Sequence, residues 1–193
     1  FLQFLNGLDK GSAYALIALG LTIVFGTLGV VNFAHGALFM IGAFCAVAFR
    51  YLLTLETVHV DPTKLSPWGQ PLEVREPLVQ AWFGDFGAIL VNYSVPLSLL
   101  LAVPVMLLVG VAMERGLIKF FYKRPHAEQI LVTFGLAIVI GEVIKALFGP
   151  NPHPQPMPTD LRGAADIGAW LGMQAGVITY PLWRLVYFLF AIA

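Results

Sequence analysis

A long uncharged stretch extends from Gly11 to Phe49 and contains no Asp, Glu, Lys or Arg. About 20 apolar residues cross a bilayer as a helix, so this stretch is long enough for two spans. In its middle, Gly26, Gly29 and Gly36 are interpreted as turn or close-packing positions, because glycine permits positive φ and tight backbone approach. Irregular backbone within hydrocarbon must be enclosed by protein or line an aqueous cavity. The pattern therefore predicts two transmembrane helices joined by a broken, glycine-rich connection.

Hydropathy divides the whole chain into five apolar segments. They cover residues 11–31, 34–53, 94–113, 129–148 and 181–193. The short connections favour antiparallel neighbours, so we expect an all-α membrane protein built as a polytopic transmembrane helix bundle. The last segment is too short to cross a bilayer, and a terminal carboxylate in hydrocarbon would be costly. We therefore expect residues 1–193 to be the N-terminal part of a single transmembrane domain, truncated within its fifth span.

The composition agrees with a membrane location. Hydrophobic residues make up 59% of the chain and charged residues only 11%, whereas a soluble domain averages about 25% charged residues. The formal net charge is zero, which argues against a nucleic-acid partner and against steering of strongly charged ligands. With a single cysteine, Cys45, the chain can form no intrachain disulfide.

Sequence motifs for nucleotide binding and catalysis are missing. The sequence contains no G-x-x-x-x-G-K-[ST] loop, no G-x-S-x-G elbow and no H-E-x-x-H pair. No second histidine or carboxylate stands at ligand spacing from His35, so we expect no metal site and no cofactor. These absences favour a translocation subunit over an enzyme.

Basic residues predict the orientation. The connection between the third and fourth spans carries Arg115, Lys119, Lys123 and Arg124. By the positive-inside rule this connection lies in the cytoplasm, which places the N-terminus outside and the Asn32–Gly36 break near the inner side. The connection over residues 50–92 and the one after the fourth span then lie outside as loops. Alternating prolines at 150–158 predict an extended, polyproline-like strap in the latter.

Asn32 and His35 are the polar side chains of the break. An imidazole there can line a substrate pathway, relay protons, or satisfy backbone carbonyls that the break leaves free. Thr22 and Thr133 are single hydroxyls on apolar helices, where such groups commonly bond to their own backbone. We take Asn32, His35 and Thr22 as candidate residues of a substrate pathway.

Glu142 and Lys145 lie three residues apart in the fourth span, on one helix face. Charged side chains within spans are costly and often functional. Because the pair lies near the outer end, Lys145 can extend to the interface and neutralise Glu142. Alternatively, Glu142 lines the entrance of the pathway, and we keep it as a fourth candidate pathway residue.

Several segments resemble the LivH-type permeases of branched-chain amino acid ABC importers. They are NGLDKGSAYALIALGLTIVFG (6–26), LGVVNFAHG (28–36), MIGAF (40–44), TFGLAIVIGE (133–142) and LFGP (147–150). The N-F-A-H-G segment after an uncharged helix is the most specific of these. The resemblance extends over most of the chain, and the connection over residues 50–92 is its weakest part.

This resemblance implies that the chain is half of the membrane channel of an ATP-driven bacterial importer. The expected location is the inner membrane, and the expected substrate is leucine, isoleucine, valine or a related amino acid. The implied partners are a second, LivM-like permease subunit, two cytoplasmic ATP-binding subunits, a periplasmic substrate-binding protein and the lipid bilayer. The coupling helix that docks such permeases onto the ATPase is expected beyond Ala193.

Other functions fit parts of the pattern. Related urea permeases are similar in the N-x-A-H-G segment, so urea or short amides are an alternative substrate class. A secondary transporter would need buried carboxylates near the midplane, for which Glu142 alone is thin support. A channel or structural subunit would show no dependence on ATP.

The predicted orientation can be tested by cysteine labelling. A cysteine at Lys119 or Lys123 should react with a membrane-impermeant maleimide only from the cytoplasmic side, because the basic connection is retained there. A cysteine at Lys64 or His153 should react only from outside. Labelling of position 119 from the periplasmic side would reverse the assigned topology.

Overall fold

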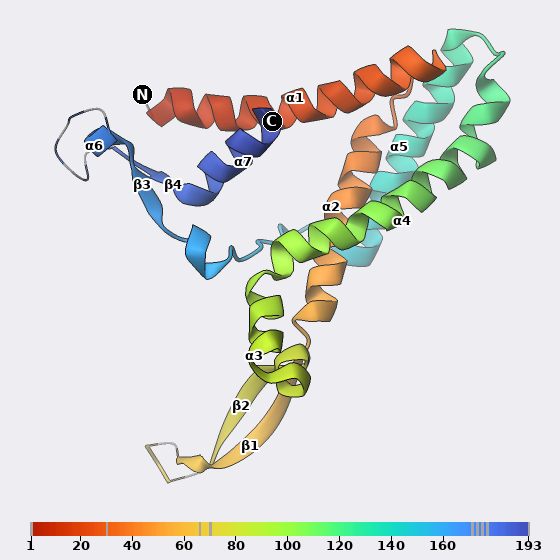
Figure 1. Ribbon diagram of the computed structural model, residues 1–193. Coiled ribbons are helices and arrows are strands. Elements are labelled where there is room, and N and C mark those ends of the chain that lie inside the picture. Colours follow the sequence, from red (N-terminus) through yellow and green to blue (C-terminus); the bar gives the residue numbers. More distant parts are fainter. Residues whose placement is uncertain are drawn as a thin grey trace.

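The computed structural model describes residues 2–29, 31–65, 67–69, 71–170, 172, 174, 176 and 178–192, and most of them are helical (Figure 1). The helices are α1 (Leu2–Leu28), α2 (His35–Leu53), α3 (Leu78–Asn92), α4 (Ser94–Gly116), α5 (His126–Phe148), α6 (Ile167–Trp170) and α7 (Leu182–Ile192). Two short 3-10 helices, η1 (Ile118–Phe121) and η2 (Thr159–Leu161), lie in the connections. The strands form two antiparallel hairpins, β1 (Glu56–Leu65) with β2 (Pro71–Pro77) and β3 (Ala164–Asp166) with β4 (Thr179–Pro181).

Four of these helices are long and apolar enough to cross a membrane. They are Leu2–Thr27, His35–Leu53, Ser94–Phe121 and His126–Phe148, with mean hydropathy between 1.4 and 2.5. Most of their apolar side chains point away from the rest of the chain, and Leu108 and Leu131 are 71% and 72% exposed. Such faces suit lipid or a protein partner and not water. The predicted fold class, a polytopic membrane helix bundle, is confirmed.

Helix α2 lies at the centre and packs on both α4 and α5 (Figure 1). The contact uses small side chains, which let helix backbones approach closely in membrane proteins. On α2, Ala37 and Ala46 are buried, and on α4 Ser98 and Ala102 are buried. Packing of this kind needs no large apolar core, so the broad apolar faces remain available on the outside of the helices.

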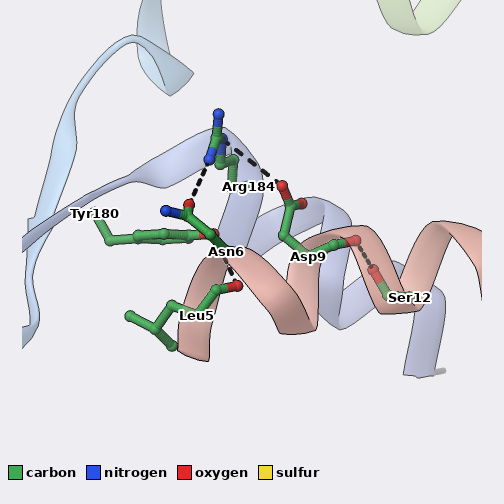
Figure 2. Close-up of polar contacts among 6 residues, drawn as sticks. All are labelled: Leu5, Asn6, Asp9, Ser12, Tyr180 and Arg184. Carbon is green, nitrogen blue, oxygen red and sulfur yellow. Dashed lines mark hydrogen bonds and ion pairs between the residues drawn. The ribbon is translucent and has the colours of Figure 1, made fainter. Parts of the chain in front are cut away.

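The first part of helix α1 is set apart from α4 and α5, and its first turns lie beside α7 (Figure 1). Figure 2 shows the polar side chains of this joint. The Tyr180 hydroxyl donates to the carbonyl of Leu5 at 3.1 Å, and Arg184 Nη1 donates to Asn6 Oδ1 at 2.7 Å. Arg184 Nε also lies 3.8 Å from a carboxylate oxygen of Asp9. These contacts fasten the two helices near their first turns.

The Asp9–Arg184 pair accounts for a difference from the expected boundary of the first span. Hydropathy placed that boundary at Gly11 because Asp9 and Lys10 are charged. In the structure the helix begins at Leu2, and the Asp9 charge meets Arg184 from a segment far along the chain. Only the Glu142–Lys145 pair was anticipated within the spans, so Asp9–Arg184 is an ion pair that sequence reasoning missed.

The expectation that residues 50–92 form a loop is wrong, whereas their position outside the membrane stays a prediction. The segment contains the β1–β2 hairpin, in which Val58 pairs with Arg75, and then helix α3. Helix α3 is sharply kinked at Gly84, whose φ of +58° is open to glycine but unfavourable for other residues. After the kink the chain folds back so closely that a Cβ at Gly87 would lie 2.2 Å from the carbonyl oxygen of Val79. A segment this short and glycine-rich gives no span-length apolar signal.

The proline-rich strap after α5 has no regular secondary structure, yet its side chains are held against α2. The ring nitrogens of His153 lie 3.0 Å from the Tyr51 hydroxyl and 2.9 Å from the carbonyl of Phe148. Arg50 Nη1 donates to Gln155 Oε1 at 3.0 Å. The strap therefore covers the end of the α2–α5 pair at which α5 ends.

Beyond the strap, backbone N–H groups of Gly176 and Ala169 donate to Asp166 and lower the pKa of its carboxyl.

The fold-back in α3 predicts a position-specific effect of added side-chain volume. Gly87→Ala should lower the free energy of unfolding by about 1–3 kcal/mol, because its new methyl group meets backbone atoms that cannot move aside. Gly110→Ala in α4 is the matched control. A Cβ there meets nothing within 4 Å, so its effect should be neutral or stabilising by up to about 1 kcal/mol. The measurement is thermal unfolding of the purified protein in detergent, and equal melting temperatures for the two variants would contradict the fold-back.

Candidate functional site

The connection between α1 and α2 is the predicted break, and Asn32 organises it. The chain leaves α1 through Gly29, whose φ is +63°. Asn32 is only 3% exposed, and its Oδ1 accepts a hydrogen bond from the N–H of Ala34 at 2.9 Å. Its backbone carbonyl accepts from the N–H of His35 at 3.3 Å. Asn32 thereby satisfies two of the N–H groups that have no helical partner at the start of α2.

Thr133 of α5 joins this connection to the bundle. Its hydroxyl accepts a hydrogen bond from the N–H of Phe33 at 3.1 Å and donates to the carbonyl of Gln129 at 2.8 Å. Thr133 is only 3% exposed, so its hydrogen bond with the N–H of Phe33 is shielded from water. A hydroxyl has one donor and two acceptor sites, which is enough for both bonds. Thr133 bonds to its own helix, as expected, and also holds the break, which was not expected.

Gln129 lies one turn before Thr133 on the same face of α5 and is 2% exposed. Its Nε2 donates to the carbonyls of Phe121 and Arg124, both at 3.0 Å. Those carbonyls belong to the connection between α4 and α5, which Figure 1 shows at the same end of the bundle as the break. We call Gln129, Thr133 and the backbone groups that they bond the Gln129–Thr133 network. It ties the α1–α2 connection and the α4–α5 connection to one helix face.

His35 begins α2 and reaches α1. Its Nε2 lies 3.1 Å from the carbonyl oxygen of Ile17, so the proton must be on Nε2 for this hydrogen bond. The ring lies against Gly20, where a Cβ would be 3.1 Å from both Cε1 and Nε2 of the imidazole. Gly20 was missed by sequence reasoning because nothing local distinguishes it from other helix glycines. Of the three roles considered for His35, this contact favours the one in which the imidazole forms a hydrogen bond with a backbone carbonyl.

The other candidate residues lie away from the break. Thr22 is exposed, and its hydroxyl donates to the carbonyl of Ala18 at 2.8 Å. Glu142 accepts from Lys145 at 2.6 Å, with both side chains more than 60% exposed. Among the described residues, no hydrogen bond or ion pair joins Thr22 or Glu142 to Asn32 or His35. Their part in a substrate pathway stays a prediction.

The three glycines singled out in the sequence differ in what the structure shows of them. Gly29 has the positive φ that favours glycine, whereas Gly26 and Gly36 have ordinary helical surroundings. A Cβ at Gly26 or Gly36 would meet no atom within 4 Å. Close packing at these two positions is therefore not needed among the described residues. Within the same part of the chain, no group of three or more His, Cys, Asp or Glu side chains could hold a metal ion.

Comparisons with known proteins point to one family. The family described as "Branched-chain amino acid transport system / permease component" matches residues 3–155 of the chain. These residues include the break, His35 and the Gln129–Thr133 network. The comparison with solved structures found no match.

Curated proteins similar to the chain carry related descriptions. It is 49% identical over 59 residues to the high-affinity branched-chain amino acid transport system permease protein BraD of Pseudomonas aeruginosa, covering 29% of this chain and 19% of that protein. It is 44% identical over 63 residues to LivH of Salmonella typhimurium, covering 33% and 20%. It is 46% identical over 59 residues to LivH of Escherichia coli, covering 31% and 18%. Each match spans about a fifth of the relative's length.

The Gln129–Thr133 network can be tested at its hydroxyl. Thr133→Val keeps the shape but leaves the N–H of Phe33 without its acceptor, so the free energy of unfolding should fall by about 1–3 kcal/mol. Thr133→Ser keeps the hydroxyl and should restore most of the loss. The control is Thr27→Val, because the exposed Thr27 hydroxyl bonds only to its own helix among the described residues. Thermal unfolding in detergent distinguishes the three, and a Thr133→Val protein as stable as the control would remove the network's structural role.

Proposed function

Because the chain belongs to the family of branched-chain amino acid transport system permease components, we propose that it forms half of a translocation pathway for branched-chain amino acids in an ATP-driven importer. The observation that carries the proposal is the family match over residues 3–155. A chain of this family is a multi-pass subunit of the bacterial inner membrane and not the subunit that performs catalysis. The relatives named above are described as high-affinity branched-chain amino acid permeases, which supports the substrate class.

The exposed faces of the helices support assembly with other membrane chains. On α4, Leu100, Leu107 and Leu108 are 65–71% exposed. A second, LivM-like permease subunit would cover part of such a face, and lipid would cover the rest. Two ATP-binding subunits would supply the energy from the cytoplasmic side, since the sequence has no phosphate-binding loop. A periplasmic binding protein would deliver the substrate.

The polar groups of the break suit a substrate that must pass without being held tightly. A leucine zwitterion carries an α-amino and an α-carboxylate group, and its side chain offers no charge. We propose Asn32, His35, Thr22 and Glu142 as residues of the pathway. The Asn32 side chain uses Oδ1 for Ala34, and its amide N–H groups remain as donors for a passing carboxylate. Tight affinity would reside in the external binding protein, because a strongly held substrate would leave the membrane pathway slowly.

Uptake kinetics test whether the external binding protein, and not the permease, sets the affinity for the substrate. In the assembled transporter, Asn32→Ala and His35→Ala should lower the maximal rate of leucine uptake several-fold with little change in the half-saturating concentration. Both residues hold the break, whereas the binding protein sets the affinity. Thr27→Ala is the control, because its exposed hydroxyl bonds to its own helix.

The measurement is uptake of radiolabelled leucine into vesicles with and without ATP. A variant with altered substrate preference and an intact maximal rate would show that the permease itself selects. Uptake that follows an ion gradient without ATP would replace the proposal by a secondary transporter. Preference for urea would replace the substrate class.

A further inference from the structure

The end of α2, the end of α3 and the strap come together on the side predicted to face outward (Figure 1). A cavity of about 260 Å³ is lined by residues of these segments. Arg50 and Thr54 line it from the end of α2, and Arg162 lines it from beyond η2. Ala88, Val91 and Met157 supply apolar wall. We call this space the arginine cavity. None of the candidate pathway residues belongs to it.

Hydrogen bonds fix the walls of the arginine cavity. Asn92 Oδ1 accepts from the N–H of Thr159 at 3.0 Å, which joins the end of α3 to η2. The bond from Arg50 to Gln155 joins α2 to the strap. Arg162 Nε donates to the carbonyl of Met157 at 3.0 Å, so this guanidinium is held beside the strap. Both arginines are therefore tied to the strap by a hydrogen bond, and Arg162 remains exposed.

The two guanidinium groups carry charge that no described carboxylate neutralises. The described ion pairs include neither Arg50 nor Arg162. Asp160, two residues before Arg162, instead accepts a hydrogen bond from the hydroxyl of Tyr93. A cavity lined by two guanidinium groups that have no carboxylate partner is suited to an anionic ligand.

We propose that the arginine cavity binds the α-carboxylate of an aliphatic amino acid at the outer mouth of the pathway. The guanidinium fork matches a carboxylate in geometry and charge. The Thr54 hydroxyl is a further donor, and Ala88, Val91 and Met157 form a wall for an aliphatic side chain. The volume is slightly below the range of about 300–1,000 Å³ for drug-sized ligands, as expected for a smaller molecule. This assignment rests on the proposed function for its choice of ligand.

Protection of a cysteine in the wall tests the assignment in the complete transporter. The probe is Met157→Cys in a Cys45→Ala background, reacted with a membrane-impermeant maleimide from outside. Leucine and 4-methylpentanoate, which has the carboxylate but no amine, should both slow the reaction. The amine 3-methylbutan-1-amine, which has no carboxylate, should not. Sulfate at equal ionic strength reports whether any anion suffices.

The second part of the protection experiment removes the charge of each arginine. Arg50→Gln or Arg162→Gln should raise the leucine concentration that gives half-protection by about tenfold or more, because each removes charge-assisted hydrogen bonds. The matched control is Arg75→Gln, which removes the same charge from the exposed β2 strand and should leave protection unchanged.

Four outcomes overturn the carboxylate site: no protection by leucine, protection by the amine, sulfate as effective as leucine, or unchanged protection in both arginine variants. The proposed function fails separately if the complex does not take up leucine with ATP. Protection by 4-methylpentanoate without leucine transport would keep the site and reject that function. Leucine transport without protection of the cysteine would reject the site and keep the proposed function.

Discussion

Backbone N–H and C=O groups within a bilayer must find partners inside the protein, because hydrocarbon offers none. The break between α1 and α2 is the place in the described chain where this constraint is most demanding. Asn32 bonds the N–H of Ala34, Thr133 bonds the N–H of Phe33, and Asn32's own carbonyl takes the N–H of His35. The approach of α5 to α2 therefore does more than pack apolar surface. It brings a buried hydroxyl to the N–H of Phe33 in the connection.

The same helix face serves a second connection. Gln129 bonds two carbonyls between α4 and α5 and lies one turn from Thr133. A movement of α5 would consequently shift both connections together. The mechanical link is made of few, buried hydrogen bonds, each of which is costly to leave unmade.

Charged side chains outside the break are paired in part. Asp9 and Arg184 compensate each other where α1 meets α7, and Glu142 and Lys145 compensate each other on α5. Arg50 and Arg162 have no such carboxylate among the described residues, although both are positioned by hydrogen bonds. In the proposed carboxylate site, this fixed positive charge would attract the carboxylate end of a zwitterion. The break itself contains no acidic or basic side chain besides the imidazole of His35.

The sequence by itself determined the class of protein and the course of its apolar helices. The stretch without charge between Gly11 and Phe49 requires a membrane, and its glycine-rich middle requires a break, whatever surrounds it. Hydropathy expected a span over residues 34–53, and α2 runs from His35 to Leu53. These features follow from side-chain type and local spacing, which the chain carries without reference to its partners.

Tertiary structure alone decided which polar residues meet. Thr133 and Phe33 are a hundred positions apart, and Arg184 is further still from Asn6, so no local pattern relates them. Gly20 is not distinguished by its local sequence, and only the fold brings the ring of His35 against it. Helix α3 folds back at Gly84 and Gly87 because backbone torsion, and not hydropathy, directs that part of the chain. Likewise, Arg50 and Arg162 face one cavity only because the strap returns to the end of α2, a path that long-range hydrogen bonds select.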